Sequence, residues 1–100
     1  MLYTGKQIVA RVKSHIRRRG GKYNAWFVGV SPDARARLFT KHSVRKKGDC
    51  WILVHAESAQ VAQKVKRYLV KKLGLAGASE VADMAADFVY AYKKSANTQP

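Results

Sequence analysis

The sequence has few acidic residues, one cysteine and no long hydrophobic run. These shortages exclude a balanced surface charge, an internal disulfide and a membrane-spanning helix. Only six of its 100 residues are Asp or Glu, against twenty Lys or Arg, so the formal net charge is +14. The lone cysteine, Cys50, excludes an internal disulfide and a cysteine-based zinc site. No apolar run approaches the ~20 residues of a membrane-spanning helix, and the first residues hold no signal-peptide stretch. We therefore expect a cytoplasmic, intracellular protein with no membrane partner.

The sequence also lacks the residue patterns of common catalytic and cofactor sites. It contains no Ser-His-Asp set, no phosphate-cradling glycine loop and no paired carboxylates. Its three histidines, His15, His42 and His55, are not spaced for a metal ion. We therefore expect no catalytic residue, no metal site and no cofactor, and we favour a binding module over an enzyme without excluding one.

The hydrophobic pattern predicts one small α/β (α+β) domain over residues 1–94 and a flexible tail over 95–100. A chain of 100 residues with 47% hydrophobic residues can build a core of its own. The predicted helices cover residues 4–19, 31–44 and 58–73, with a helical turn around 80–86, and the predicted strands cover residues 23–30, 50–56 and 88–92. The order α-β-α-β-α-(α)-β predicts a three-stranded sheet flanked by helices.

Short-range signals mark where the predicted helices begin and end. Thr4 and Gln7 have the spacing of a capping box at the start of the first helix. Ser31 is the expected N-cap of the second helix. Gly74 is the expected left-handed residue after the third helix. The helix limits are therefore predicted from a few residues at each end.

The positive charge is concentrated in residues 1–72, which hold eighteen Lys or Arg and three Asp or Glu. Such an imbalance is typical of proteins that bind nucleic acid or an anionic membrane. A surface that served only solubility would mix both signs and avoid the self-repulsion. We therefore predict that nucleic acid is the partner and that its phosphates are the main contacts.

The candidate phosphate contacts fall on the predicted helices and on one basic turn. Arg35 and Arg37 follow a predicted helix N-terminus, which attracts anions, and other basic residues are spaced along helix faces that could extend one surface. Each residue alone also fits the solvated face of an amphipathic helix. The full set of candidates is Arg17, Arg18, Arg19, Arg35, Arg37, His42, Arg45, Lys46, Lys47, Lys64, Lys66, Arg67 and Lys71.

Residues 22–73 resemble the GIY-YIG nuclease family. Phe27-Val28-Gly29 stands where that family has Tyr-Ile-Gly at the end of a strand, and Arg37 stands at the arginine of the following helix. His42 lies near the position of the histidine or tyrosine one turn later. The resemblance implies that the next strand and helix correspond to the third strand and the metal-binding helix, and that the scaffold has a positive groove for phosphates.

The chain departs from that family at the residues needed for cleavage. The first motif, Gly-Ile-Tyr on a preceding strand, is missing, and Phe27 replaces the second tyrosine. Lys66 lies near the position of the metal-binding glutamate, on a predicted helix without Asp or Glu. Because an ammonium group repels a hard cation, the resemblance implies a catalytically degenerate scaffold.

Other functions stay open at this point. A nuclease with an atypical metal ligand would have to use Asp49, Glu57 or Glu80. A small interaction or inhibitor module would use the positive charge against an acidic protein partner. The sequence leaves a homodimer open, and it does not separate DNA from RNA.

Overall fold

The computed structural model describes residues 2–77, 86–96 and 98. Its elements, in chain order, are α1 (Gly5–Arg19), η1 (Tyr23–Ala25), β1 (Trp26–Ser31), α2 (Ala34–Ala36), η2 (Arg37–Lys41), β2 (Trp51–His55), α3 (Ala59–Tyr68), η3 (Leu69–Leu73), β3 (Ala76–Gly77) and β4 (Phe88–Lys93). The short helix η1 is a 3₁₀ turn, whereas η2 and η3 are π-helical turns that continue α2 and α3.

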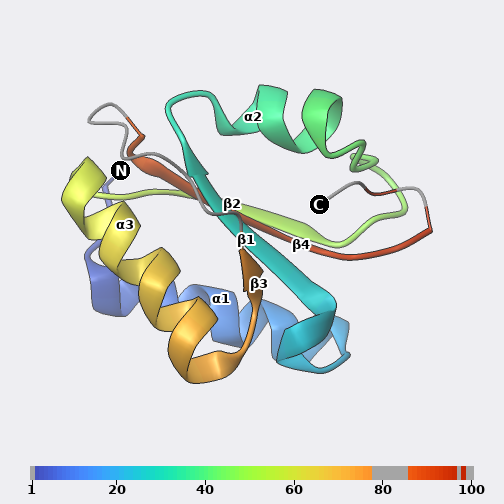
Figure 1. Ribbon diagram of the computed structural model, residues 1–100, viewed down its shortest axis with the longest axis horizontal. Coiled ribbons are helices and arrows are strands. Elements are labelled where there is room, and N and C mark those ends of the chain that lie inside the picture. Colours follow the sequence, from blue (N-terminus) through green and yellow to red (C-terminus); the bar gives the residue numbers. More distant parts are fainter. Residues whose placement is uncertain (1, 78–85, 97, 99–100) are drawn as a thin grey trace.

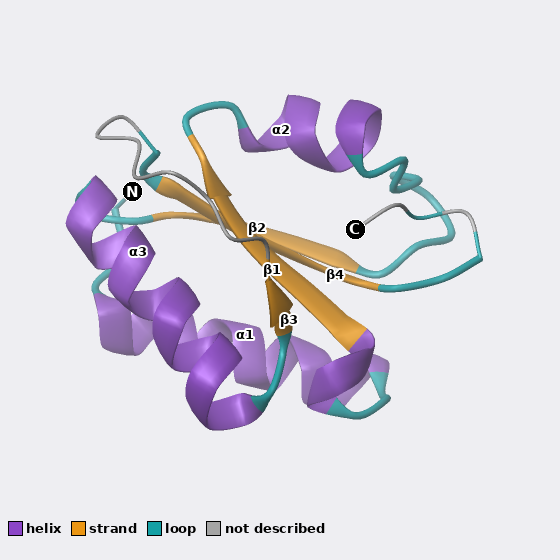
Figure 2. Cartoon of the chain, viewed as in Figure 1, coloured by secondary structure: helices purple, strands orange, loops and turns teal. Residues whose placement is uncertain are grey.

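A mixed four-stranded sheet lies between two layers of helix (Figures 1 and 2). The strand order is β2-β4-β1-β3, with β1 parallel to β3 and β4 antiparallel to both β1 and β2. Helices α1 and α3 cover one face of the sheet, and α2 with η2 covers the other (Figure 1). The predicted α+β class is confirmed.

Each face of the sheet has its own hydrophobic cluster, because successive side chains of a strand point to opposite faces. In β1, Trp26 and Val28 pack in the cluster beneath α1 and α3, whereas Phe27 packs in the cluster beneath α2. Burying each large side chain of this kind stabilises the fold by about 1.5–3 kcal/mol. The central strand β1 is buried on both sides along its whole length.

Helix α1 lies within one residue of the predicted limits, residues 4–19. Ile8, Val12 and Ile16 repeat every four residues and form its buried stripe. The Thr4 hydroxyl accepts a hydrogen bond from the Gln7 backbone N–H at 3.2 Å, and the Gln7 side chain accepts one from the Thr4 N–H at 2.9 Å. The predicted capping box is therefore confirmed.

The end of the third helix is also confirmed. Gly74 adopts a left-handed conformation with φ of 85° and follows η3. The backbone N–H of Leu75 then donates to the Leu69 carbonyl at 3.2 Å, and the Leu75 side chain is buried. Only glycine adopts this φ without steric cost.

The sheet has four strands rather than the predicted three. The extra strand is β3, in which Ala76 pairs with Phe27 and Gly77 pairs with Val28. Two residues are too few to show a strand periodicity, so the pattern did not predict β3. The predicted helical turn around 80–86 lies, except for Ala86, outside the described residues.

The predicted N-cap of the second helix is wrong. Ser31 is the last residue of β1, where its hydroxyl accepts a hydrogen bond from the Asp33 N–H at 3.0 Å. Asp33 is the actual N-cap, because its carboxylate accepts from the Ala36 N–H at 3.2 Å. Both residue types cap helices well, so the choice between them depended on where the strand ended.

The segment expected as a flexible tail begins with a turn. The Ser95 N–H donates to the Thr98 hydroxyl at 2.8 Å, and the Thr98 N–H donates back to the Ser95 carbonyl at 3.2 Å. The Thr98 side chain is buried. Within the described ranges, no helix is long and apolar enough to cross a lipid bilayer.

Candidate nucleic-acid interface

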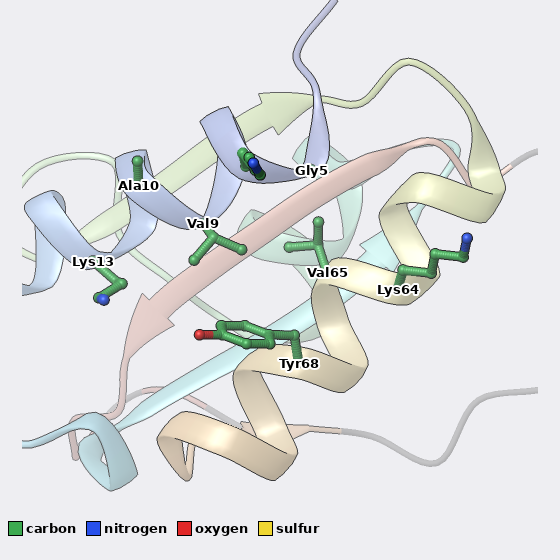
Figure 3. A pocket seen from close by; sticks show the side chains of 8 residues that line it. Gly5, Val9, Ala10, Lys13, Lys64, Val65 and Tyr68 are labelled. Atoms are coloured by element: carbon green, nitrogen blue, oxygen red, sulfur yellow. The ribbon is translucent and has the colours of Figure 1, made fainter.

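A groove separates α1 from α3 on the outer side of their layer (Figure 3). Its volume is about 560 Å³, within the range of small-molecule sites. Its floor is apolar, and its rim carries three lysines and one tyrosine. We call it the α1–α3 groove, and its lining residues are Gly5, Val9, Ala10, Val65, Lys6, Lys13, Lys64 and Tyr68.

Helical spacing places these residues along the groove. Lys6 and Lys13 are seven residues apart on α1, so they lie two turns apart on the same side of that helix. Lys64 and Tyr68 are four residues apart on α3 and share one side of it. At the start of α1, a Cβ on Gly5 would be 3.7 Å from Val65 Cγ2, so the two helices come close there.

Tyr68 offers an aromatic surface to the groove. Its exposed fraction is 43%, and only Leu2 among the large described hydrophobic residues is more exposed. Its ring reaches from α3 toward α1, below Val9 (Figure 3). It has no ring contact or hydrogen bond with the described residues, whereas Trp51 packs edge-on against Phe39. Its ring face is thus available to a ligand.

The helical layer around the groove is strongly positive. Helices α1 and α3 with η3 carry eleven of the twenty basic residues and no acidic residue. The three groove lysines form no ion pair with the described residues. Their charge is therefore uncompensated. The eleven basic residues are Lys6, Arg11, Lys13, Arg17, Arg18, Arg19, Lys64, Lys66, Arg67, Lys71 and Lys72.

The structure brings two of the predicted groups to this side of the sheet. Arg17, Arg18 and Arg19 are exposed in the last turn of α1. The stripe of Lys64, Arg67 and Lys71 is exposed along α3 and η3. Of these six residues, Lys64 lines the α1–α3 groove itself, and the others add charge to the same layer.

The other two groups lie with α2, on the opposite side. Arg35 is exposed on α2 and Arg37 is half-buried in η2, and the turn residues Arg45, Lys46 and Lys47 follow η2. The chain crosses from β1 to β2 over one face and from β2 to β3 over the other (Figure 1). The expectation that the basic turn and the α3 stripe extend one surface is therefore corrected.

The start of α2 is less attractive to an anion than the sequence suggested. The Asp33 carboxylate already accepts the Ala36 N–H there. A hollow of about 410 Å³ beside α2 has Asp33 in its wall together with Arg37 and Lys41. A carboxylate in the wall repels a phosphate, so this hollow is a weaker candidate than the α1–α3 groove.

His42 does not reach the surface. Its exposed fraction is 4%, its Nε2 lies 2.9 Å from the Tyr90 hydroxyl and its Nδ1 lies 3.2 Å from the Tyr92 hydroxyl. Both ring nitrogens are thus engaged in the cluster beneath α2. Burial raises the pKa of Tyr92 to about 12. His42 is therefore a structural residue, and its assignment as a nucleic-acid contact is wrong.

Lys66, another predicted phosphate contact, is also buried. Its exposed fraction is 8%, because it lies on the side of α3 that faces β3 rather than on the outer side. A Cβ on Gly77 would be 3.7 Å from Lys66 Cε, which places the aliphatic part of the lysine beside that strand. Lys66 is therefore removed from the surface contacts.

The arginines at the end of α1 affect a half-buried histidine. His15 packs edge-on against Trp26, with 5.6 Å between the ring centroids. Its Nε2 is buried and has no hydrogen-bond partner within the described residues. Burial, and then the positive charges of Arg19 and Arg18, lower the pKa of His15 below its usual 6.5. The two arginines thus add to an effect that burial alone already produces.

Two of the carboxylates considered for an atypical metal site are far apart. Asp49 precedes β2 and Glu57 follows it, so a five-residue strand of roughly 17 Å separates them. One Asp49 oxygen accepts the Arg45 backbone N–H at 2.8 Å. Glu80 lies outside the described residues. In the part of the chain that the structure describes, no three His, Cys, Asp or Glu side chains gather as metal ligands.

No protein-family model, curated protein or solved structure matches this chain. The GIY-YIG resemblance therefore stays a prediction. Of the residues named for it, Arg37 and His42 lie on the α2 side, whereas Lys66, which stands near the position of the family's metal-binding glutamate, lies beside β3.

Three residues of the groove were not among the sequence candidates. Lys6, Lys13 and Tyr68 do not belong to the set of candidate contacts that the sequence predicts. The seven-residue spacing of Lys6 and Lys13 was a usable signal for a basic helix face. The sequence contained no signal that this face of α1 lies beside Tyr68 of α3.

Proposed function

We propose that the protein binds nucleic acid through the α1–α3 groove, without cleaving it. The observation that carries the proposal is the groove itself, in which three lysines surround an apolar floor and form no ion pair with the described residues, in a helical layer whose helices hold no Asp or Glu. Phosphates are the ligands that such a layer attracts most strongly. The interface would extend from the groove over the exposed arginines of α1 and the stripe along α3.

The mechanism is the exchange of counterions for lysine and arginine side chains. Each phosphate that is neutralised releases condensed cations, so the logarithm of the binding constant falls by roughly 0.9 per phosphate for each tenfold rise in salt on duplex DNA. With Lys6, Lys13 and Lys64 in the groove and further cations around it, about six contacts are available. The salt dependence should therefore be steep.

Comparison of the two helical layers favours the groove over the hollow beside α2. Among the described residues, those that line the groove include no carboxylate, whereas Asp33 lines the other hollow. The groove also contains the exposed ring of Tyr68, onto which a base can stack. The α2 side would then contribute only long-range attraction.

The test measures binding of labelled DNA and RNA by fluorescence anisotropy at several salt concentrations. Lys13→Ala should weaken binding about twofold to fivefold, as for one exposed ion pair, and should lower the salt slope by about one unit. The matched control is Lys41→Ala, which removes the same charge from the hollow beside α2 and should change affinity less than twofold.

Two results would contradict the proposal. Affinity that is independent of salt would exclude phosphate binding altogether. Equal losses for Lys13→Ala and Lys41→Ala would show that binding is spread over the whole surface rather than centred on the groove.

A further inference from the structure

We infer that the α1–α3 groove accepts an unpaired base, which stacks on Tyr68, and that the protein therefore prefers single-stranded nucleic acid to duplex. This inference rests on the proposed function and names the class of nucleic acid. It depends on three features that phosphate binding alone does not require, namely an open aromatic ring, an apolar floor and lysines on both sides of the groove.

The first feature is the tyrosine ring. A large aromatic side chain that is 43% exposed gives up part of the free energy that burial would provide. Trp26, Tyr90 and Tyr92, by contrast, are fully buried. A base stacked on Tyr68 would cover its ring face, and every base can do so because each has a π-face.

The second feature is the floor of the groove. Val9, Ala10 and Val65 line it and carry no polar side-chain atom. A base edge or a deoxyribose would bury apolar surface against them, whereas a phosphate would gain nothing from that contact. Phosphate binding alone therefore does not account for the apolar floor.

The third feature is the position of the lysines. Lys6 and Lys13 lie on α1, separated by about 10 Å along the helix axis. Lys64 lies across the groove on α3, and Figure 3 shows Lys13 and Lys64 on either side of the Tyr68 ring. A strand whose base enters the groove would therefore meet positive charge on both sides of the inserted nucleotide.

A duplex cannot use these features together. Its bases are paired and stacked within the helix, so only its phosphates would reach the lysines, and bringing a base onto Tyr68 would cost a few kcal/mol of unpairing. In an unpaired strand the base needs only to unstack, so the free-energy cost of bringing it onto Tyr68 is much smaller. We therefore expect tighter binding to the single strand at equal salt.

The experiment compares a labelled 12-nucleotide strand, as DNA and as RNA, with a blunt duplex of the same sequence. Tyr68→Leu should weaken single-strand binding at least fivefold, the loss expected when one stacked base loses its aromatic partner. It should change duplex binding less than twofold and leave the salt slope as it is. Tyr68→Phe keeps the ring and should stay within threefold of the unmodified protein. Thermal unfolding followed by circular dichroism checks that both variants are folded.

The outcomes separate the inference from the proposed function. If single strand and duplex bind equally, in a salt-dependent manner that needs Lys13, and Tyr68→Leu has no effect, the inference is wrong and the proposed function stands. If none of the three nucleic acids binds, both are wrong. A single-strand preference that is lost in Tyr68→Leu and kept in Tyr68→Phe supports both.

Discussion

Gly29→Ala should destabilise the fold strongly, because the side chain of Tyr90 occupies the space above this glycine. The two residues are direct partners between β1 and β4. A Cβ built on Gly29 would overlap Cζ and Oη of Tyr90 and would lie 2.9 Å from Cε2. Tyr90 is fully buried, and its hydroxyl lies 2.9 Å from His42 Nε2. The ring therefore has little space into which it can move.

Two contributions determine the magnitude. Relieving the overlap requires a movement of about 1 Å in a packed core, and overpacking of this kind costs about 1–3 kcal/mol. The same movement strains the hydrogen bond between Tyr90 and His42, and an unsatisfied buried polar group costs about 1–3 kcal/mol. We expect Gly29→Ala to lower the free energy of unfolding by about 2–6 kcal/mol, which corresponds to a melting temperature at least ~8 °C lower.

The assay is urea unfolding followed by circular dichroism. The matched control is Gly5→Ala, in which the new Cβ would be 3.7 Å from its nearest neighbour, at ordinary contact distance. This helical substitution should leave stability within about 1 kcal/mol. In the Tyr90→Leu background, which lacks all three atoms near the new Cβ, Gly29→Ala should cost less than about 1 kcal/mol.

Two outcomes would refute this reasoning. One is a Gly29→Ala variant that melts within 2 °C, a threshold of about 0.5 kcal/mol, of the unmodified protein. The other is an equal cost of Gly29→Ala with and without Tyr90→Leu, because the loss would then arise from the β1 backbone and not from the tyrosine ring.

Three further predictions concern titration and cleavage. The pKa of His15 is lowered in the folded state, so the unfolded state binds the proton first as the pH falls below 6.5. The stability that depends on the neutral His15 ring is therefore fully present above pH 6.5 and is lost below that pH. His15→Gln should therefore reduce the loss of stability between pH 7.5 and 5.5 in urea unfolding, and an unchanged pH slope would contradict this. Burial raises the pKa of Tyr92 to about 12, so stability should fall as the pH rises from 10 toward 12. Tyr92→Phe should lack that fall and cost about 1 kcal/mol at pH 7, from its lost bond to His42; an unchanged alkaline profile would refute this assignment. Gel electrophoresis should show DNA and RNA uncut after incubation with Mg²⁺ or Mn²⁺, whereas cleavage that disappears in Arg37→Ala would contradict the absence of catalysis.

The sequence by itself determined the features that depend on neighbours along the chain. Three such features are the capping box of Thr4 and Gln7, the buried stripe of α1 that begins at Ile8, and the left-handed Gly74. Each depends on residues that lie within a turn or two of one another. The net charge of +14 and its concentration before residue 73 are also properties of the sequence alone. Such signals act over short distances, and tertiary packing did not override them.

Only the tertiary structure decided which residues share a surface. Strand β4, last in the chain, pairs between β1 and β2, and the consecutive crossovers place α2 and α3 on opposite faces of the sheet. This arrangement buries His42 against Tyr90. It also places Arg37, which belongs to η2, and Lys64, which belongs to α3, in different helical layers. It also brings Lys13 beside Tyr68, fifty-five residues later in the chain. These pairings depend on contacts between distant segments, which periodicity and capping signals do not encode.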